Sequence, residues 1–300
     1  QILAVVIYDN ADGKGKIYRI AGKEDEEKYE KACKALRNLI KAQKGRTSPV
    51  PEENLPVPGG GNPSDSGLFY NFLPGVLYGL KTWGDLFNDR QKLSLIIFIQ
   101  KINEAARRIR EEVKDVEYAI AIKAFLALIL GRLVDYNSTL CLLNSTGGRG
   151  VVHTFGRTAL NMTWNYMETN PFSPIGANWQ AGIEAIEKAF DKSLVTNLNG
   201  SSIDIRYGTA TNLPYDDEEF DLVITDPPYY SSVPYSYLSD FFYVWYKRLL
   251  KDDFPTLFST PLTPKSDEIM QNLSLLRGQS KRAAANDESL SIKTDEIFRT

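Results

Sequence analysis

The residues best suited to carry out chemistry are Asp226-Pro227-Pro228-Tyr229, a short string that follows an apolar run. The run from Phe220 to Thr225 is rich in β-branched residues, which predicts a strand, and the two prolines must end it. They would hold the Asp226 carboxylate, a hydrogen-bond acceptor, stiffly at the carboxyl end of the strand, where open α/β sheets bind ligands. With ordinary residue usage such a tetrapeptide arises by chance in roughly one chain in a thousand of this length. We therefore interpret it as a candidate active site rather than as a plain Pro-Pro turn.

A helix and a second strand are expected just before this motif. Ala181 to Lys192 carries apolar residues at helical spacing, and Ser202 to Tyr207 is a second β-rich run. A helix followed by strands, with loops at the carboxyl ends of the strands, is typical of an α/β sheet. Residues 176–300 are therefore predicted to form an α/β region that contains the motif.

The first half of the chain predicts a hairpin followed by helices. Residues 1–22 hold two β-rich runs around a cluster of turn formers, which indicates a β-hairpin or a sheet segment. Residues 23–175 follow as a mainly helical region, with a Pro/Gly-rich loop near 47–75. Three helices are expected within this region, the last two packing as a pair: 23 to 44, the N-cap Asn88 to about Arg110, and about Val116 to Tyr136.

The composition excludes several classes of protein. A net charge of -3 and a pI near 5.5 argue against a surface that coats nucleic acid indiscriminately, so any DNA binding must use local patches. Cys33 and Cys141 are far apart and lack neighbouring metal ligands, which indicates neither a disulfide framework nor a metal site. The longest apolar stretch, Ala119 to Val134, is shorter than a bilayer span and contains Lys123 and Arg132. We expect a soluble, cytoplasmic protein with no membrane partner.

The tetrapeptide resembles the Asp/Asn/Ser-Pro-Pro-aromatic motif of the amino-methyltransferases that modify adenine N6 or cytosine N4 in DNA. The resemblance implies S-adenosylmethionine as cofactor and a base that leaves the duplex. Asp226 and the Pro227 carbonyl would accept the two hydrogens of the base amine, because an amine conjugated with the ring is a poor nucleophile. Pro228 would keep these acceptors pointing inward, and Tyr229 would stack on the base.

Three further segments resemble one subgroup, the DUF1156-type adenine-specific DNA methylases. They are Gly79 to Phe87, His153 to Arg157, and Tyr229 through Tyr235 to Trp245. The implied fold is a Rossmann-like methyltransferase sheet, with residues 23–175 as a large, mainly helical insertion. Tyr230 and Tyr235 would contact the base or the DNA.

The resemblance also implies where the cofactor would bind. Gly208, Thr209 and Ala210 follow the strand predicted at Ser202 to Tyr207, in the loop that borders the adenine of the cofactor in that family. The family's Gly-rich cofactor loop lies upstream of these motifs, and this chain does not contain it. Gly59 to Gly61 and Gly147 to Gly150 do not link a strand to a helix, so we interpret them as linkers. Because the chain opens at Gln1, we expect a piece of a longer protein that holds the base pocket and half of the cofactor site.

Other features have structural interpretations. An aromatic stripe after the motif, formed by Tyr237, Phe241 and Trp245, is expected to be core. The basic groups at 107–110 and 247–248 are expected at solvated helix ends rather than on phosphates. His153, the single histidine, is expected in a structural or hydrogen-bonding role.

Three functions remain open at this point. The first is a DNA amino-methyltransferase, adenine N6 being favoured over cytosine N4. The second is a non-catalytic module that binds nucleic acid or assembles with a partner. The third keeps the chemistry on RNA or on a protein amide, a case that an Asn at position 226 would have favoured.

Overall fold

The computed structural model describes residues 2, 4–9, 15–43, 47–56, 73–144, 150–173, 178–196, 204–206, 208, 212–226, 233 and 235–265. The described chain begins with the predicted hairpin, formed by β1 (Ala4–Asp9) and β2 (Gly15–Ile20) in antiparallel register. Helix α1 (Lys23–Ala42) follows as expected. Asp25 in its first turn accepts hydrogen bonds from the Arg19 guanidinium and from the Gly22 N–H, which joins the hairpin to the helix.

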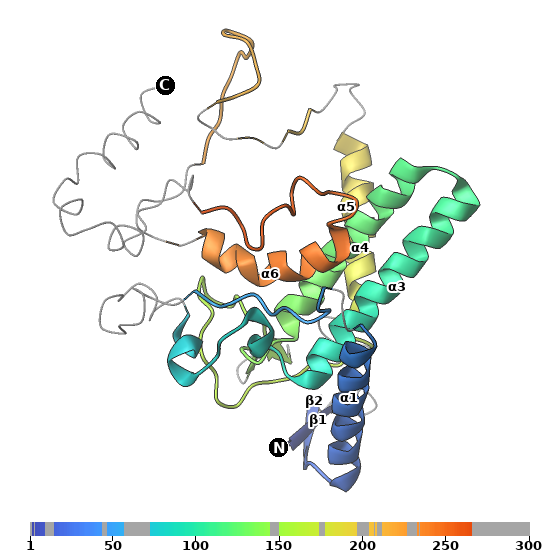
Figure 1. The fold of residues 1–300 in the computed structure, drawn as a ribbon, viewed down its shortest axis with the longest axis vertical. Helices are drawn as coiled ribbons and strands as arrows, with labels where there is room; N and C mark the ends of the chain where they lie inside the picture. Colours follow the sequence, from blue (N-terminus) through green and yellow to red (C-terminus); the bar gives the residue numbers. More distant parts are fainter. Residues whose placement is uncertain are drawn as a thin grey trace, which may run out of the picture.

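The predicted helical pair is present as α3 (Asp89–Val113) and α4 (Val116–Tyr136). Asn88 and Gln91 form the expected capping box: each side-chain oxygen accepts the backbone N–H of the other residue at 2.9 Å. The two helices are antiparallel neighbours, and α1 packs on α3 (Figure 1). Two short 3₁₀ helices, η3 (Pro74–Tyr78) and η4 (Trp83–Leu86), lead into α3.

The remaining helices pack on α4. Helix α5 (Trp179–Thr196) is longer at both ends than the sequence predicts, and α6 (Tyr235–Leu250) crosses the helical pair (Figure 1). Helix α6 approaches α4 closely at Gly131, where a side chain would not fit, because a Cβ there would lie 1.8 Å from the Tyr246 hydroxyl. Residues of α1, α3, α4 and α6 share one hydrophobic core. This core therefore includes residues on both sides of position 175, where the mainly helical region was predicted to end. Among the described residues, no helix is long and apolar enough to span a membrane.

The chain is a mixed α/β protein in which the described helices dominate. The sheets seen in the described residues are β1–β2 and a second antiparallel pair, β3 (Leu142–Leu143) with β4 (Val151–Val152). The sequence did not predict this second pair, whose strands are only two residues long.

The two strands expected before the motif are not formed in the part described. Residues 204–206 and 220–226 are outside any strand, and they extend away from the helices (Figure 1). A strand is defined by its pairing, and this stretch has no described partner strand. The prediction of strands at 202–207 and 220–225 is therefore wrong for the residues that the structure describes.

Candidate active site

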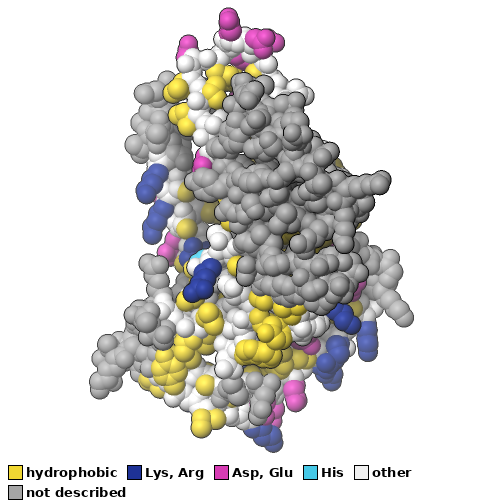
Figure 2. Space-filling view, turned by 90° about the vertical axis from the view of Figure 1, so that its left-hand side faces the viewer, with side chains coloured by type: hydrophobic (Ala, Val, Ile, Leu, Met, Phe, Trp, Pro, Cys, Tyr) yellow, Lys and Arg dark blue, Asp and Glu magenta, His cyan; other side chains and the backbone are white. Residues whose placement is uncertain are grey.

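Asp226 lies in a solvent-exposed segment without regular secondary structure. The side chains of Leu222, Val223 and Ile224 before it are 75%, 67% and 85% exposed, and Asp226 is exposed as well. Exposed hydrophobic side chains lie beside acidic ones at the upper end of the molecule, where this segment lies (Figure 2). Pro227, Pro228, Tyr229 and Tyr230 lie outside the described residues, so the roles assigned to them stay predictions.

A compact turn precedes the Asp226 segment and brings the ends of the two expected strands together. The Arg206 guanidinium lies 2.7 Å from the Asp204 carboxylate and 4.9 Å above the Tyr215 ring. That ring in turn meets the edge of Phe220 at 4.8 Å. Residues 206 and 220 are thereby linked through Tyr215, which makes this turn a local unit.

Of the three residues of the predicted cofactor loop, the structure describes Gly208. It is exposed, and a Cβ placed on it would meet no described atom within 4 Å. Thr209 and Ala210 lie outside the described residues. Open space beside a glycine allows a ligand to approach the backbone closely, so the contact of Gly208 with S-adenosylmethionine stays a prediction.

Tyr235, the other predicted contact residue, is the first residue of α6. Its side chain is 46% exposed, and its N–H donates to the Val233 carbonyl at 3.0 Å. The exposed ring is thus available at the start of a helix whose other face is buried.

The segments that carry the sequence resemblance meet in one aromatic cluster. Phe87, from the first segment, stacks on Phe241 at 5.4 Å and meets Trp245 edge-on at 5.2 Å. Phe155, from the second segment, contacts Phe241 at 5.4 Å and stacks on Phe242 at 5.3 Å. Phe241 and Trp245 are fully buried, which confirms the core role expected for them, whereas Tyr237 is half-buried and lies outside the core. The cluster fixes the position of the helix that follows the motif.

The first segment is also fixed through its backbone. Trp83 donates its N–H to the Glu53 carbonyl at 3.0 Å, and Gly84 donates its N–H to the Pro51 carbonyl at 2.9 Å. A Cβ on Gly84 would lie 2.4 Å from that carbonyl oxygen, so only glycine fits without a shift.

His153 joins the end of α4 to the second segment. Its Nδ1 lies 2.8 Å from the Asp135 carboxylate, and its ring stacks on Tyr136 at 5.3 Å. The Nδ1 makes no well-aligned hydrogen bond, so the contact is an ion pair when the imidazole is protonated. Burial raises the pKa of Asp135, and the nearby imidazole opposes that rise. These contacts agree with the structural role expected for His153.

The basic groups that could have met phosphates are mostly engaged within the protein. The side chain of Arg248 is mostly buried and forms a bidentate pair with Glu53 at 3.0 and 3.1 Å. Arg107 pairs with Glu111 on the surface of α3 at 2.7 Å. Arg107 thus matches the expected solvated helix end, whereas Arg248 is a structural anchor. In the described part of the chain, no cluster of three or more His, Cys, Asp or Glu residues could hold a metal ion.

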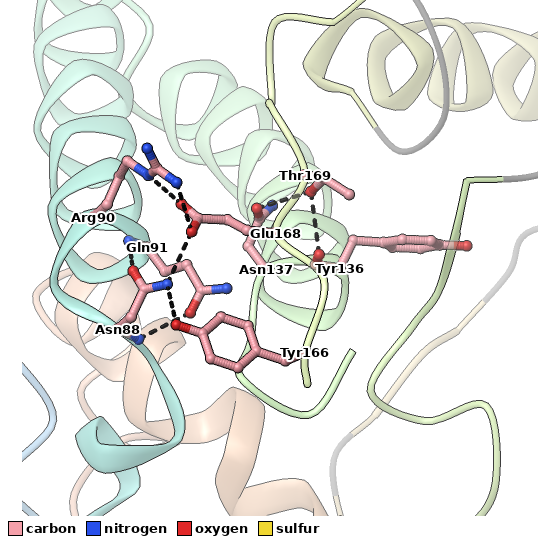
Figure 3. Close-up of polar contacts among 8 residues, drawn as sticks. All are labelled: Asn88, Arg90, Gln91, Tyr136, Asn137, Tyr166, Glu168 and Thr169. Carbon is pink, nitrogen blue, oxygen red and sulfur yellow. Dashed lines mark hydrogen bonds and ion pairs between the residues drawn. The ribbon is translucent and has the colours of Figure 1, made fainter. Parts of the chain in front are cut away.

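Sequence reasoning missed two polar networks. Asp240, fully buried in α6, accepts hydrogen bonds from the Thr263 N–H and hydroxyl and lies 2.8 Å from the Lys265 ammonium. Figure 3 shows the second network, in which Glu168 lies beside the start of α3 and accepts hydrogen bonds from Nε and Nη2 of Arg90. Both networks join residues more than 20 positions apart in the sequence, so no local sequence pattern predicts them.

Comparison with known proteins gives no match. No family model matches this chain, and no significant match was found among curated proteins or among solved structures.

Proposed function

We propose that this protein is an S-adenosylmethionine-dependent methyltransferase acting on the exocyclic amino group of a DNA base, adenine N6 being favoured over cytosine N4. The proposal rests on the resemblance of Asp226-Pro227-Pro228-Tyr229 to the amino-methyltransferase motif. It assigns to Asp226 and the Pro227 carbonyl the acceptance of the two amine hydrogens, and to Tyr229 stacking on the base.

The observation that carries the proposal is the motif itself, and the other resembling segments lie close to the helix that follows it. They are separated by long stretches of chain, yet Phe87 and Phe155 both contact Phe241. They therefore fix the position of that helix. Asp226 is exposed, as a residue that meets a large substrate must be.

The proposal assigns the adenine of the cofactor to the loop at Gly208, which is exposed and has open space beside its Cα among the described residues.

The exposed run before Asp226 favours a second candidate, a module that assembles with a partner and is not catalytic on its own. Leu222, Val223 and Ile224 have the composition of a buried strand but are mostly exposed. Burial of such a run against another polypeptide would be favourable at about 25 cal/mol per Å² of apolar surface.

One set of measurements separates these candidates. S-adenosylmethionine binding is followed by calorimetry, and transfer of a radiolabelled methyl group is measured with DNA, RNA and protein as acceptors. Methylated adenine in DNA supports the proposal, and methylated cytosine changes only the base. Transfer to RNA or protein alone replaces the substrate, and absence of both cofactor binding and transfer favours the non-catalytic module.

A further inference from the structure

Tyr78 and Trp164 form an exposed aromatic pair far from the motif in sequence. Their ring centroids are 5.2 Å apart at 76°, yet Tyr78 is 55% and Trp164 is 74% exposed. Leu77 beside them is also exposed. Figure 2 views the side of the molecule on which η3 lies in Figure 1, and hydrophobic side chains gather in the lower half of this face. An exposed apolar patch of this kind marks an interaction site more often than chance.

The segment that carries Trp164 is held firmly on both sides of the indole. Before it, the Thr163 hydroxyl donates to the Leu140 carbonyl at 3.3 Å; after it, the Met167 N–H donates to the Cys141 carbonyl at 2.9 Å.

Further along, side chains fasten the same segment to two helices. Tyr166 accepts from the Asn88 amide at 3.0 Å, and the Glu168–Arg90 pair follows (Figure 3). The Thr169 hydroxyl contacts the Tyr136 carbonyl at 3.1 Å. The indole is therefore presented by a fixed segment, and little conformational entropy would be lost when a ligand stacks on it.

The segment that carries Tyr78 is fixed as well. Leu80 donates its N–H to the Gly75 carbonyl at 3.3 Å across the end of η3, and the Lys81 carbonyl accepts the Leu55 N–H at 2.8 Å. Both aromatic rings thus belong to anchored backbone.

The two segments that carry the aromatic pair are basic, which favours an anionic ligand. Residues 73–82 and 156–167 contain the exposed Lys81 and Arg157 and no acidic residue, although the whole chain has more acids than bases. Of the acids that follow these segments, Glu168 is neutralised by its pair with Arg90, and Asp85 keeps its charge but directs its carboxylate to the backbone N–H groups of Lys81 and Thr82. A ligand with flat rings joined by negative charges fits both properties.

We propose that Tyr78 and Trp164 form a stacking platform for an unpaired base of single-stranded nucleic acid, with Lys81 and Arg157 beside its phosphates. Aromatic side chains bind unpaired bases through their π-faces without strong sequence preference, and basic side chains supply the contact to the backbone. The choice of nucleic acid as ligand rests on the proposed function, but the platform requires no cofactor and no catalysis.

The test measures the affinity for fluorescein-labelled single-stranded DNA and RNA oligonucleotides by fluorescence anisotropy. Trp164→Ala is expected to weaken binding roughly tenfold, the effect of losing one base–aromatic stack, and Trp164→Phe should retain part of the affinity. Phe172→Ala is the matched control, because Phe172 is also exposed, at 76%, but stacks on Phe98 away from the pair. Its affinity should equal that of the unaltered protein.

The proposal is overturned by any of three results: no binding of either oligonucleotide, equal affinity of Trp164→Ala and the unaltered protein, or an equal loss in Phe172→Ala. Duplex DNA competing as well as the single strand would also exclude stacking on an unpaired base. Failure of the methyltransferase proposal looks different, because absence of methyl transfer leaves these affinities unchanged.

Discussion

Gly131 on α4 lets α6 approach closely, and replacing it with alanine should destabilise the protein. The added Cβ would lie 1.8 Å from the Tyr246 hydroxyl oxygen and 2.8 Å from the ring carbon that carries it. The ring cannot easily move aside, because it is stacked with Phe242 and mostly buried. The same burial raises the pKa of Tyr246 to about 12. The substitution must therefore push α4 and α6 apart or displace the ring.

Two opposing effects set the size of the change. Overpacking of a well-filled interface costs about 3 kcal/mol, while alanine is better than glycine in a helix by about 1 kcal/mol. Gly131→Ala should therefore lower the free energy of unfolding by about 2 kcal/mol. In a Tyr246→Ala background the clash is absent, so the same substitution should raise the free energy of unfolding by up to about 1 kcal/mol.

Urea denaturation of the four proteins of this double-mutant cycle measures both values. A coupling of about 3 kcal/mol between Gly131 and Tyr246, with the sign of the Gly131→Ala effect reversed, is expected. A stabilising Gly131→Ala in the unaltered background, or the same effect in both backgrounds, would refute the packing described for α4 and α6.

Two other predictions test the surroundings of the site. Gly84→Ala should lower the free energy of unfolding by about 2–4 kcal/mol in urea denaturation, because its Cβ would displace the Pro51 carbonyl and break a hydrogen bond. Gly208→Ala is the control: its added Cβ meets no described atom, so the free energy of unfolding should change by less than about 0.5 kcal/mol. Similar losses at both positions would argue against the clash at Gly84. Burial raises the pKa of Asp240, against the opposing effect of Lys265, so the stability that its proton provides is present below pH about 4 and is lost as the pH rises through the raised pKa. Melting temperatures measured from pH 4 upward should therefore shift in favour of Asp240→Asn relative to the unaltered protein, and a difference that does not vary with pH would contradict the raised pKa.

The helices could be predicted from the sequence because their signals are local. The Asn88–Gln91 capping box marked the start of α3, and the apolar pattern of 116–136 matched α4 at both ends. Phe241 and Trp245 of α6 could be predicted as core residues from their spacing alone, whereas Tyr237 at the same spacing is only half-buried. In each case residues within one or two helical turns carry the information.

The β1–β2 hairpin could be predicted because a short cluster of turn formers joins its strands, but the other strands could not, since their partners are not marked by composition. The run at 220–225 has strand composition, but no described strand pairs with it. The short β3–β4 pair was missed because two-residue strands leave no periodic pattern. At the candidate site, the exposure of Asp226 and the contact of Phe87 with Phe241 depend on tertiary packing, which spacing along the chain does not encode.

The most direct measurement of the proposed function is methyl transfer to DNA by the Asp226→Ala variant. Both Asp226 and the control residue Asp221 are exposed in the same segment, so neither substitution should change the melting temperature. If Asp226 accepts a hydrogen of the base amine, Asp226→Ala should lose at least about a hundredfold in transfer rate, whereas Asp221→Ala should retain the rate of the unaltered protein. Transfer by Asp226→Ala within a few-fold of the unaltered rate would contradict the role assigned to the carboxylate.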